Sequence, residues 1–225
     1  MIKVENIETF GLYGAMRGMR NPLNSWDKAD TTVYQGHDKE FVNIGVNDLN
    51  LATRLIKAGT EHRKFLRMIH VQMDVTAPLY WWKEADTYKV GTTANSCSTM
   101  HKIAAKEFTL DDFSHDHLFN DAVVYNGYVP TSVLECVIGA LNEFRNLYLE
   151  TKDKRYWWQM IQLLPSSYNQ RRTWDMSMET LLSILHQRKN HKLDEWNEFR
   201  DICLEQVPYL KEFYEASLKE TTNEN

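Results

Sequence analysis

Arginine side chains that interrupt apolar patterns are the residues of this chain best suited to bind an anionic or planar ligand. Arg188 follows Leu181 by seven residues and Leu185 by three, so it projects from the apolar face of its expected helix. A guanidinium on such a face requires an anionic or planar partner. On this pattern alone the stronger interpretation is structural, with the head group past the helix end or paired with a local carboxylate.

Three further arginines occupy positions of interest. In a strand that included Arg67, its side chain would point to the same face as the alternating apolar residues that begin at Ile69. The pattern favours a strand that begins after Arg67. Arg171 and Arg172 are adjacent and follow a predicted turn at 166–168. Two neighbouring guanidinium groups suit phosphate binding, but a solvated surface is the simpler interpretation of this pair on its own.

The sequence gives little support to metal or thiol chemistry. His115 and His117 stand two residues apart, but no third ligand has a recognisable spacing, so we expect no metal site. Cys97 lies among small residues, with no histidine or lysine obviously placed to activate its thiol. The three cysteines lie far apart, which is typical of reduced thiols in a cytoplasmic protein. Glycine-rich phosphate motifs and the nucleophile-elbow motif are absent from the sequence.

Composition places the chain among globular proteins. Of its 225 residues, 43% are hydrophobic and 25% are charged, which predicts one domain over 1–218 and a polar tail over 219–225. The net charge of −5 argues against a general nucleic-acid binder. No apolar run approaches about 18 residues, so no membrane span is expected. The N-terminal segment has charges within its apolar pattern and does not resemble a signal peptide.

Periodicity predicts an α+β fold that is rich in helices and has few strands. Strands are expected over 2–10 and over 69–75, where apolar and polar residues alternate up to Ala77-Pro78. Asp48 is the predicted N-cap of a helix through Lys57, and Ser132 with Glu135 forms a predicted capping box. Residues 17–40, 91–99 and 109–130 are typical of loops, and further helices are expected at 79–89, 99–108, 132–150, 153–163, 176–188 and 193–207.

These segments, in this order, resemble the flavin-dependent thymidylate synthases from about residue 48 to residue 213. In that family a helix ends in a glycine-containing turn, a strand follows, and an Ala-Pro pair opens the next helix. The corresponding stretch of this chain is LIKAGTEHRKFLRMIHVQMDVTAP followed by LYWWKEADTYK. The segment LLPSSYNQRRTWDMSMETLLSILHQRKNHKLDEWNEFRDI is similar to the family's Leu-Pro turn, its helix ending in a pyrimidine-binding Arg, and its helix with an early Trp.

The resemblance implies a helix-rich thymidylate synthase-like fold with a small antiparallel sheet, assembled as a homotetramer with sites at subunit interfaces. The family binds dUMP, FAD, NADPH and methylene-tetrahydrofolate. Arg188 matches the Arg that contacts the pyrimidine, so it is the expected catalytic residue and a nucleotide contact. Glu84 stands where the family has a nucleotide-binding Gln, and Ser96 and Ser98 lie in the loop that supplies its phosphate-binding Ser and Arg.

The family hallmark, Arg-His-Arg followed after seven residues by Ser-x-Arg, is not kept in this chain. Thr87-Tyr88-Lys89 replaces the triplet that contacts the flavin in the family, which puts ordinary FAD binding in question. The Ser-x-Arg position has no Arg, and its phosphate-binding charge has four candidate substitutes: Arg171, Arg172, Arg67 or Lys102. Arg67, Lys89 and Ser177 are the cofactor contacts that the resemblance implies.

Three functions remain open on the sequence. The preferred one is a C5 one-carbon transferase for a pyrimidine deoxynucleotide, converting dUMP to dTMP with methylene-tetrahydrofolate and reduced flavin; a flavin-free hydroxymethylase of dUMP or dCMP is a variant. The others are a non-catalytic nucleotide-binding homologue and a helical interaction protein. The size of the chain and the lack of targeting signals suit a bacterial or phage protein of the cytoplasm, with no nucleic-acid or membrane partner.

Overall fold

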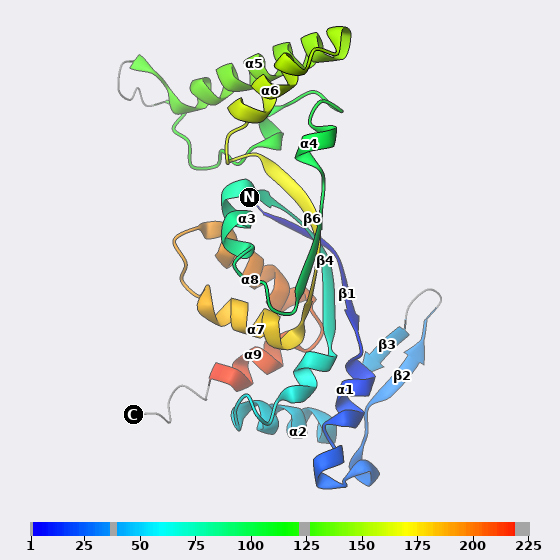
Figure 1. Ribbon diagram of the computed structural model, residues 1–225. Coiled ribbons are helices and arrows are strands. Elements are labelled where there is room, and N and C mark those ends of the chain that lie inside the picture. Colours follow the sequence, from blue (N-terminus) through cyan, green and yellow to red (C-terminus); the bar gives the residue numbers. More distant parts are fainter. Residues whose placement is uncertain (1, 37–39, 122–126, 219–225) are drawn as a thin grey trace. The chain divides into compact units, whose positions relative to one another are not determined.

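The computed structural model describes residues 2–36, 40–121 and 127–218 (Figure 1). The expected polar tail, 219–225, lies outside the described residues. The chain divides into two compact units, and each unit is assembled from three separate segments. The first unit comprises Met1–Lys3, Val75–Thr87 and Asn95–Arg172, and the second unit comprises Val4–Asp74, Tyr88–Ala94 and Thr173–Asn225.

A four-stranded sheet has the strand order β1-β4-β6-β5. Its strands are β1 (Lys3–Phe10), β4 (His70–Pro78), β6 (Asn169–Ser177) and β5 (Thr92–Ser96). Alternate side chains of β4 are buried, as the sequence predicts for a strand with one covered face: Val71, Met73, Val75 and Ala77. The fold class is α+β, rich in helices and with a small antiparallel sheet, which confirms the expectation.

Helices of the second unit pack around its buried aromatic side chains. The helix α9 (Leu210–Leu218) contacts α2 (Val46–Lys57), α7 (Met178–Gln187) and α8 (Asp194–Gln206). The largest fully buried side chains here include Trp196, Phe199 and Phe213. The smaller elements of this unit are α1 (Leu12–Gly18), the 3₁₀ turns η1 (Asn21–Leu23), η2 (Trp26–Lys28) and η3 (Lys64–Met68), and the antiparallel pair β2 (Thr32–Gln35) and β3 (Glu40–Asn43).

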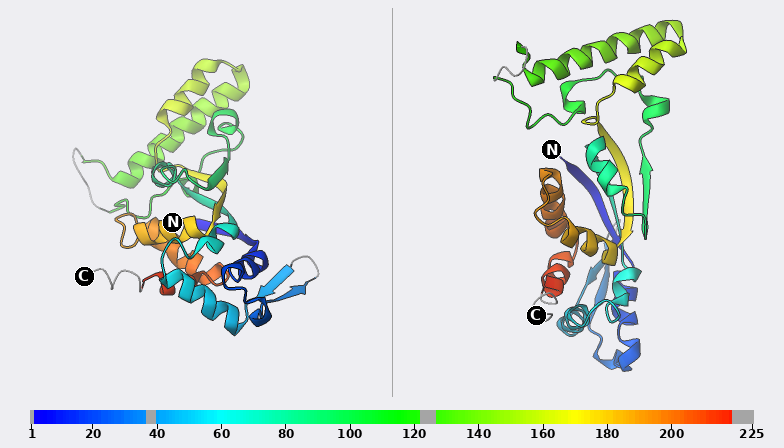
Figure 2. Two further views of the ribbon diagram at one scale, coloured as in Figure 1. Left: turned by 60° about the horizontal axis from the view of Figure 1, so that its bottom comes forward. Right: turned by 60° about the vertical axis from the view of Figure 1, so that its left-hand side comes forward.

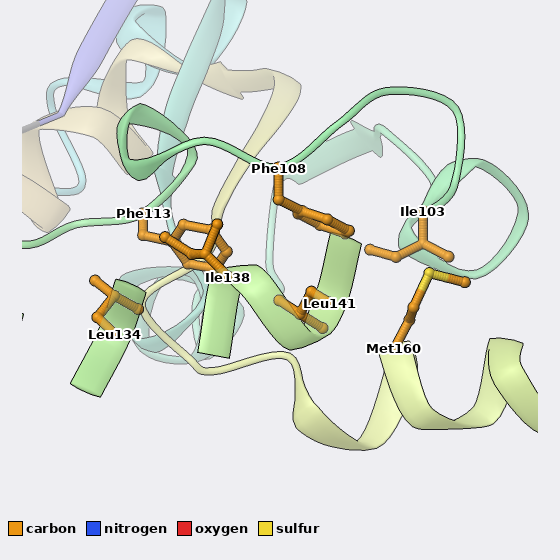
Figure 3. Close-up of a cluster of buried hydrophobic side chains, with 7 residues drawn as sticks. All are labelled: Ile103, Phe108, Phe113, Leu134, Ile138, Leu141 and Met160. Atoms are coloured by element: carbon orange, nitrogen blue, oxygen red, sulfur yellow. The ribbon is translucent and has the colours of Figure 1, made fainter. Parts of the chain in front are cut away.

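The first unit contains a helical hairpin. The long helix α5 (Pro130–Thr151) and α6 (Lys154–Leu163) lie side by side in each view (Figures 1 and 2). Their apolar faces meet the segment 103–113 in one buried cluster (Figure 3): Ile103, Phe108, Phe113, Leu134, Ile138, Leu141 and Met160. The remaining elements are α3 (Leu79–Ala85), α4 (Thr99–Lys102) and η4 (Leu110–Asp112).

Four strands were not predicted from the sequence. Residues 92–96 of the expected loop form β5, an edge strand of small polar side chains that has no apolar alternation to reveal it. Residues 169–177 form β6, in which Arg172 occupies the register of the buried Gln170 and Trp174 and so hides the alternation. The β2–β3 pair falls within and just after the expected loop 17–40.

Helix ends also differ from the predictions. The helix expected from Asp48 begins at Val46, because the carboxylate of Asp30 accepts hydrogen bonds from the backbone N–H groups of Asn47 and Asp48 at 2.8 and 2.9 Å. Ser132 is inside α5, which begins at Pro130, so the capping-box prediction is wrong. The helices expected over 79–89 and 99–108 are shorter, and α9 was not predicted.

Candidate functional site

Arg188 lies at the C-terminal end of α7 and is half-buried among aromatic rings of the second unit. Its guanidinium carbon is 4.9 Å from the ring centroid of Trp196 and 5.3 Å from that of Tyr88. Its Nε donates to the Tyr88 hydroxyl at 2.8 Å. We name Tyr88, Arg188, His191 and Trp196 the Arg188 cluster. Flat aromatic faces and a guanidinium with several N–H groups are suited to a planar ligand with carbonyl oxygens.

The imidazole of His191 faces two hydrogen-bond donors. Its Nε2 lies 3.1 Å from Arg188 Nη1, and its Nδ1 lies 3.1 Å from the backbone nitrogen of Leu193. A neutral imidazole has one acceptor nitrogen and one N–H, so each tautomer accepts only one of these two hydrogen bonds. A ligand oxygen that took the place of His191 beside Arg188 would leave the imidazole able to accept from Leu193. This arrangement favours an exchange of partner at Arg188.

The expected cofactor contact Ser177 lies at the other end of the same helix. Ser177 is the N-cap of α7, and its hydroxyl accepts from the backbone N–H of Thr180 at 3.2 Å. The ten residues of α7 span roughly 15 Å, so Ser177 and Arg188 cannot contact one atom. Gly91 approaches Thr180 closely, since a Cβ there would lie 3.2 Å from the Thr180 hydroxyl. The segment from Tyr88 to Gly91 therefore follows α7 along its length.

The two expected cationic contacts of the cofactor are exposed. Arg67 belongs to η3 and not to β4, which confirms that the strand begins after it. Lys89 follows Tyr88 directly, and its side chain is turned to solvent. Both side chains are accessible to a ligand, but neither is held by a described hydrogen bond or ion pair.

A second guanidinium stacks on an aromatic ring in the first unit. The guanidinium carbon of Arg172 is 4.2 Å from the ring centroid of Trp82. Arg172 donates to Asp86 Oδ1 at 2.7 Å and to Gln170 Oε1 at 3.0 Å, and the indole N–H of Trp82 donates to the Gln170 carbonyl at 2.8 Å. We name Trp82, Asp86, Gln170 and Arg172 the Trp82 cluster. Its polar groups are bonded to one another.

The expected phosphate contacts lie on two neighbouring strands and at the N-cap of α4. The backbone N–H of Cys97, between Ser96 and Ser98, donates to the Arg171 carbonyl at 2.9 Å, so the backbone of this segment runs beside that of Arg171. The Ser98 hydroxyl accepts from the His101 backbone N–H at 3.0 Å and caps α4. Glu84 lies in the last turn of α3 and is half-exposed.

Comparison with solved structures identifies the fold. Thymidylate synthase X from Helicobacter pylori, crystallised with FAD and dUMP, is 15% identical; the match covers 96% of this chain and 99% of that chain, with a TM-score of 0.66. The chain has the thymidylate synthase X fold. A second Helicobacter pylori structure, also with FAD and dUMP, is 15% identical and matches 96% of this chain and 98% of that chain, with a TM-score of 0.64.

A related methylase has the thymidylate synthase X fold as well. The UMP/dUMP methylase PolB from Streptomyces cacaoi, bound with 5-Br dUMP, is 14% identical; the match covers 96% of this chain and 94% of that chain, with a TM-score of 0.62. No family model and no curated protein matches the sequence. The resemblance to flavin-dependent thymidylate synthases is therefore confirmed at the level of the fold.

The residues that replace the family's flavin-contacting triplet do not fit a flavin in the manner of thymidylate synthase X. The Thr87 hydroxyl donates to the Glu84 carbonyl at 2.7 Å, the Tyr88 ring and hydroxyl contact Arg188 and Trp196, and Lys89 alone carries positive charge. This donor set lacks the two guanidinium groups and the imidazole that the family presents.

Sequence reasoning found Arg188 but not the role of Tyr88. The position of Tyr88 within the replaced triplet was visible, but its partner lies 100 residues further along the chain. Among residues 2–36, 40–121 and 127–218, no group of three or more His, Cys, Asp or Glu side chains could hold a metal ion. Within the same residues, no helix is long and apolar enough to cross a membrane.

Proposed function

We propose that this protein binds a pyrimidine deoxynucleotide such as dUMP and transfers a one-carbon unit to C5 of its ring. The observation that carries the proposal is the position of Arg188, a half-buried guanidinium beside the contacting rings of Tyr88 and Trp196 at the end of α7. The fold supports it, because thymidylate synthase X and PolB were crystallised with dUMP or 5-Br dUMP.

The proposed role of Arg188 is to orient the pyrimidine and to polarise it. A guanidinium that donates to a ring carbonyl stabilises negative charge on that oxygen, and this charge is conjugated with the C5–C6 bond. A site from which water is partly excluded strengthens the interaction. The carbon–carbon bond forms at C5 as the bond between the methylene carbon and the folate nitrogen breaks, so tetrahydrofolate leaves and the hydrogen of C5 is lost as a proton to solvent. A hydride then completes a methyl group, or water completes a hydroxymethyl group.

The remaining contacts are proposed from the resemblance. Ser96, Ser98 and Arg171 are proposed for the nucleotide phosphate, and Glu84 for the edge of the base. Methylene-tetrahydrofolate is the proposed carbon donor, and NADPH with FAD are the reductants that the resemblance implies. Because the residues in place of the triplet do not present the family's donors, a flavin would be held instead through Arg67, Lys89 and Ser177. We also propose a homotetramer as the functional assembly.

The test is the release of tritium from C5 of labelled dUMP in the presence of methylene-tetrahydrofolate. This assay reports substitution at C5 whether the product is a methyl or a hydroxymethyl group, and it is run with and without FAD and NADPH. Arg188→Ala is expected to lower the rate at least about a hundredfold. Lys189→Ala, which removes an exposed positive charge from the next residue, is the matched control. Equal rates for the wild-type protein and Arg188→Ala would overturn the proposal.

A further inference from the structure

An open pocket of about 440 Å³ in the second unit has a strongly basic lining. Three cations line it, Arg20, Lys28 and Arg54, together with the polar side chains of Ser25, Asn47 and Asn50. Among the described residues that line the pocket, none carries a carboxylate. We propose that this pocket binds the phosphate group of a small phosphorylated molecule.

Arg20 is the fixed element of the pocket. Only 3% of its surface is exposed, and its Nε donates to the carboxylate of Asp48. Its Nη1 donates to the backbone carbonyl and the hydroxyl of Ser25 at 3.2 and 3.3 Å. Its Nη2 is buried and has no hydrogen-bond partner among the described residues. Because Nη2 is enclosed, it does not reach a ligand in the pocket. Arg20 holds the wall of the pocket in place, and Lys28 and Arg54 are the charged donors within reach of a phosphate.

The carboxylates near the pocket already accept hydrogen bonds from other groups, so the lining of the pocket keeps a positive charge. Asp48 also accepts hydrogen bonds from the backbone N–H groups of Asp30 and Thr31, at 3.1 and 2.9 Å, and from the Thr31 hydroxyl. Burial alone would raise the pKa of Asp48, but the hydrogen bonds from Thr31, Arg20 and the backbone lower it below the usual value. Asp48 is therefore ionised at neutral pH and compensates the charge of Arg20 only.

Lys28 and Arg54 supply the remaining charge. Neither makes an ion pair with any residue of the described ranges, and both side chains are exposed at the pocket. Asn47, Asn50 and Arg54 are spaced by three and four residues along α2, which places them on one face of the helix. The backbone N–H groups at the start of α2 already donate to Asp30, so the pocket depends on side chains and not on the helix terminus.

The pocket is larger than a phosphate ion and is apolar at two points. Leu23 and Leu51 complete its lining. A ligand with a phosphate group at the cationic end and an organic portion against the leucines would use both features. All lining residues precede residue 55, so the inference is independent of the proposed pyrimidine site at Arg188.

The experiment is calorimetric titration of the full chain with inorganic phosphate and with glycerol 3-phosphate, at constant ionic strength set by chloride. Lys28→Gln and Arg54→Gln are each expected to weaken binding about tenfold, because each removes one charged hydrogen-bond donor. The matched control is Lys57→Gln, since Lys57 lies one turn beyond Arg54 on the same helix but lines a different pocket. The affinity of the Lys57→Gln variant for both phosphate ligands is expected to equal that of the wild-type protein. Arg20 is left intact because its pairing with Asp48 supports the fold.

The two ligands distinguish the source of the phosphate. Tighter binding of glycerol 3-phosphate indicates an organic phosphate ester, and equal binding indicates that free phosphate suffices; both results support the site. Absence of saturable binding would overturn the inference, as would an equal loss of affinity in Lys57→Gln and Arg54→Gln, which would mean general electrostatic attraction. Neither result would affect the dUMP-dependent assay of Arg188.

Discussion

Two arginines of this protein stack on aromatic rings, and their surroundings differ in kind. Arg172 lies on Trp82 in the middle of a strand and donates to a carboxylate and an amide. Arg188 lies beside the rings of Tyr88 and Trp196 at a helix end, next to a phenol hydroxyl and an imidazole. The Trp82 cluster joins α3 to β6 through bonds among its own members. The imidazole of the Arg188 cluster lies beside two donors and accepts from one of them in its neutral form.

From this difference we propose a structural role for Arg172 and a binding role for Arg188. The largest effect is expected for Arg188→Ala. This variant should bind dUMP about a hundredfold more weakly, because it lacks a charged hydrogen-bond donor to the base. Calorimetric titration measures it. Lys189→Ala should bind dUMP like the wild-type protein, and a comparable loss in both variants would contradict base recognition by Arg188.

Arg172→Ala is expected to lower the free energy of unfolding by about 2 kcal/mol, because it removes a cation–π contact and leaves the amide of Gln170 and the carboxylate of Asp86 with one partner fewer. Urea denaturation provides the measurement. Arg200→Ala, which breaks the contact of Arg200 with the exposed Asp201, should change stability by less than about 1 kcal/mol. Similar effects in both variants would mean that the Trp82 cluster has no special structural role.

Trp82→Phe is expected to cost about 1–2 kcal/mol of unfolding free energy. The change deprives the buried carbonyl of Gln170 of its indole donor and removes part of a fully buried ring. Trp158→Phe is the control, because the Trp158 side chain is 43% exposed, and its change should stay within about 0.5 kcal/mol. Thermal unfolding, measured in parallel for the two variants, compares these two changes in the free energy of unfolding.

The smallest effect is expected for Tyr88→Phe, which keeps the ring beside Arg188 but removes the hydroxyl that accepts from its Nε. The affinity for dUMP should fall roughly three- to tenfold, the value of one hydrogen bond that fixes an orientation, while urea stability changes little. A stability loss as large as that of Arg172→Ala would show instead that Tyr88 serves the fold.

The sequence predicts these two regions unequally, for physical reasons. The helix α7 and the strand β4 have strong apolar periodicity, so their positions and the interruption at Arg188 are visible. The strand β6 is hidden because Arg172 takes a core-facing position where alternation requires an apolar residue. The strand β5 is hidden because its side chains are polar and mostly exposed, and the strand is defined by its backbone pairing with β6. Tyr88 acquires its role only from Arg188, a contact between residues 100 positions apart.

The most direct test of the account is a calorimetric titration of the wild-type protein with dUMP and, in parallel, with 2-deoxyribose 5-phosphate. The two ligands share the phosphate and the sugar and differ in the base. If Arg188 and its aromatic neighbours recognise the pyrimidine, dUMP should bind at least about tenfold more tightly than the abasic ligand. Equal affinities, or no saturable binding of dUMP, would contradict a pyrimidine site in this protein.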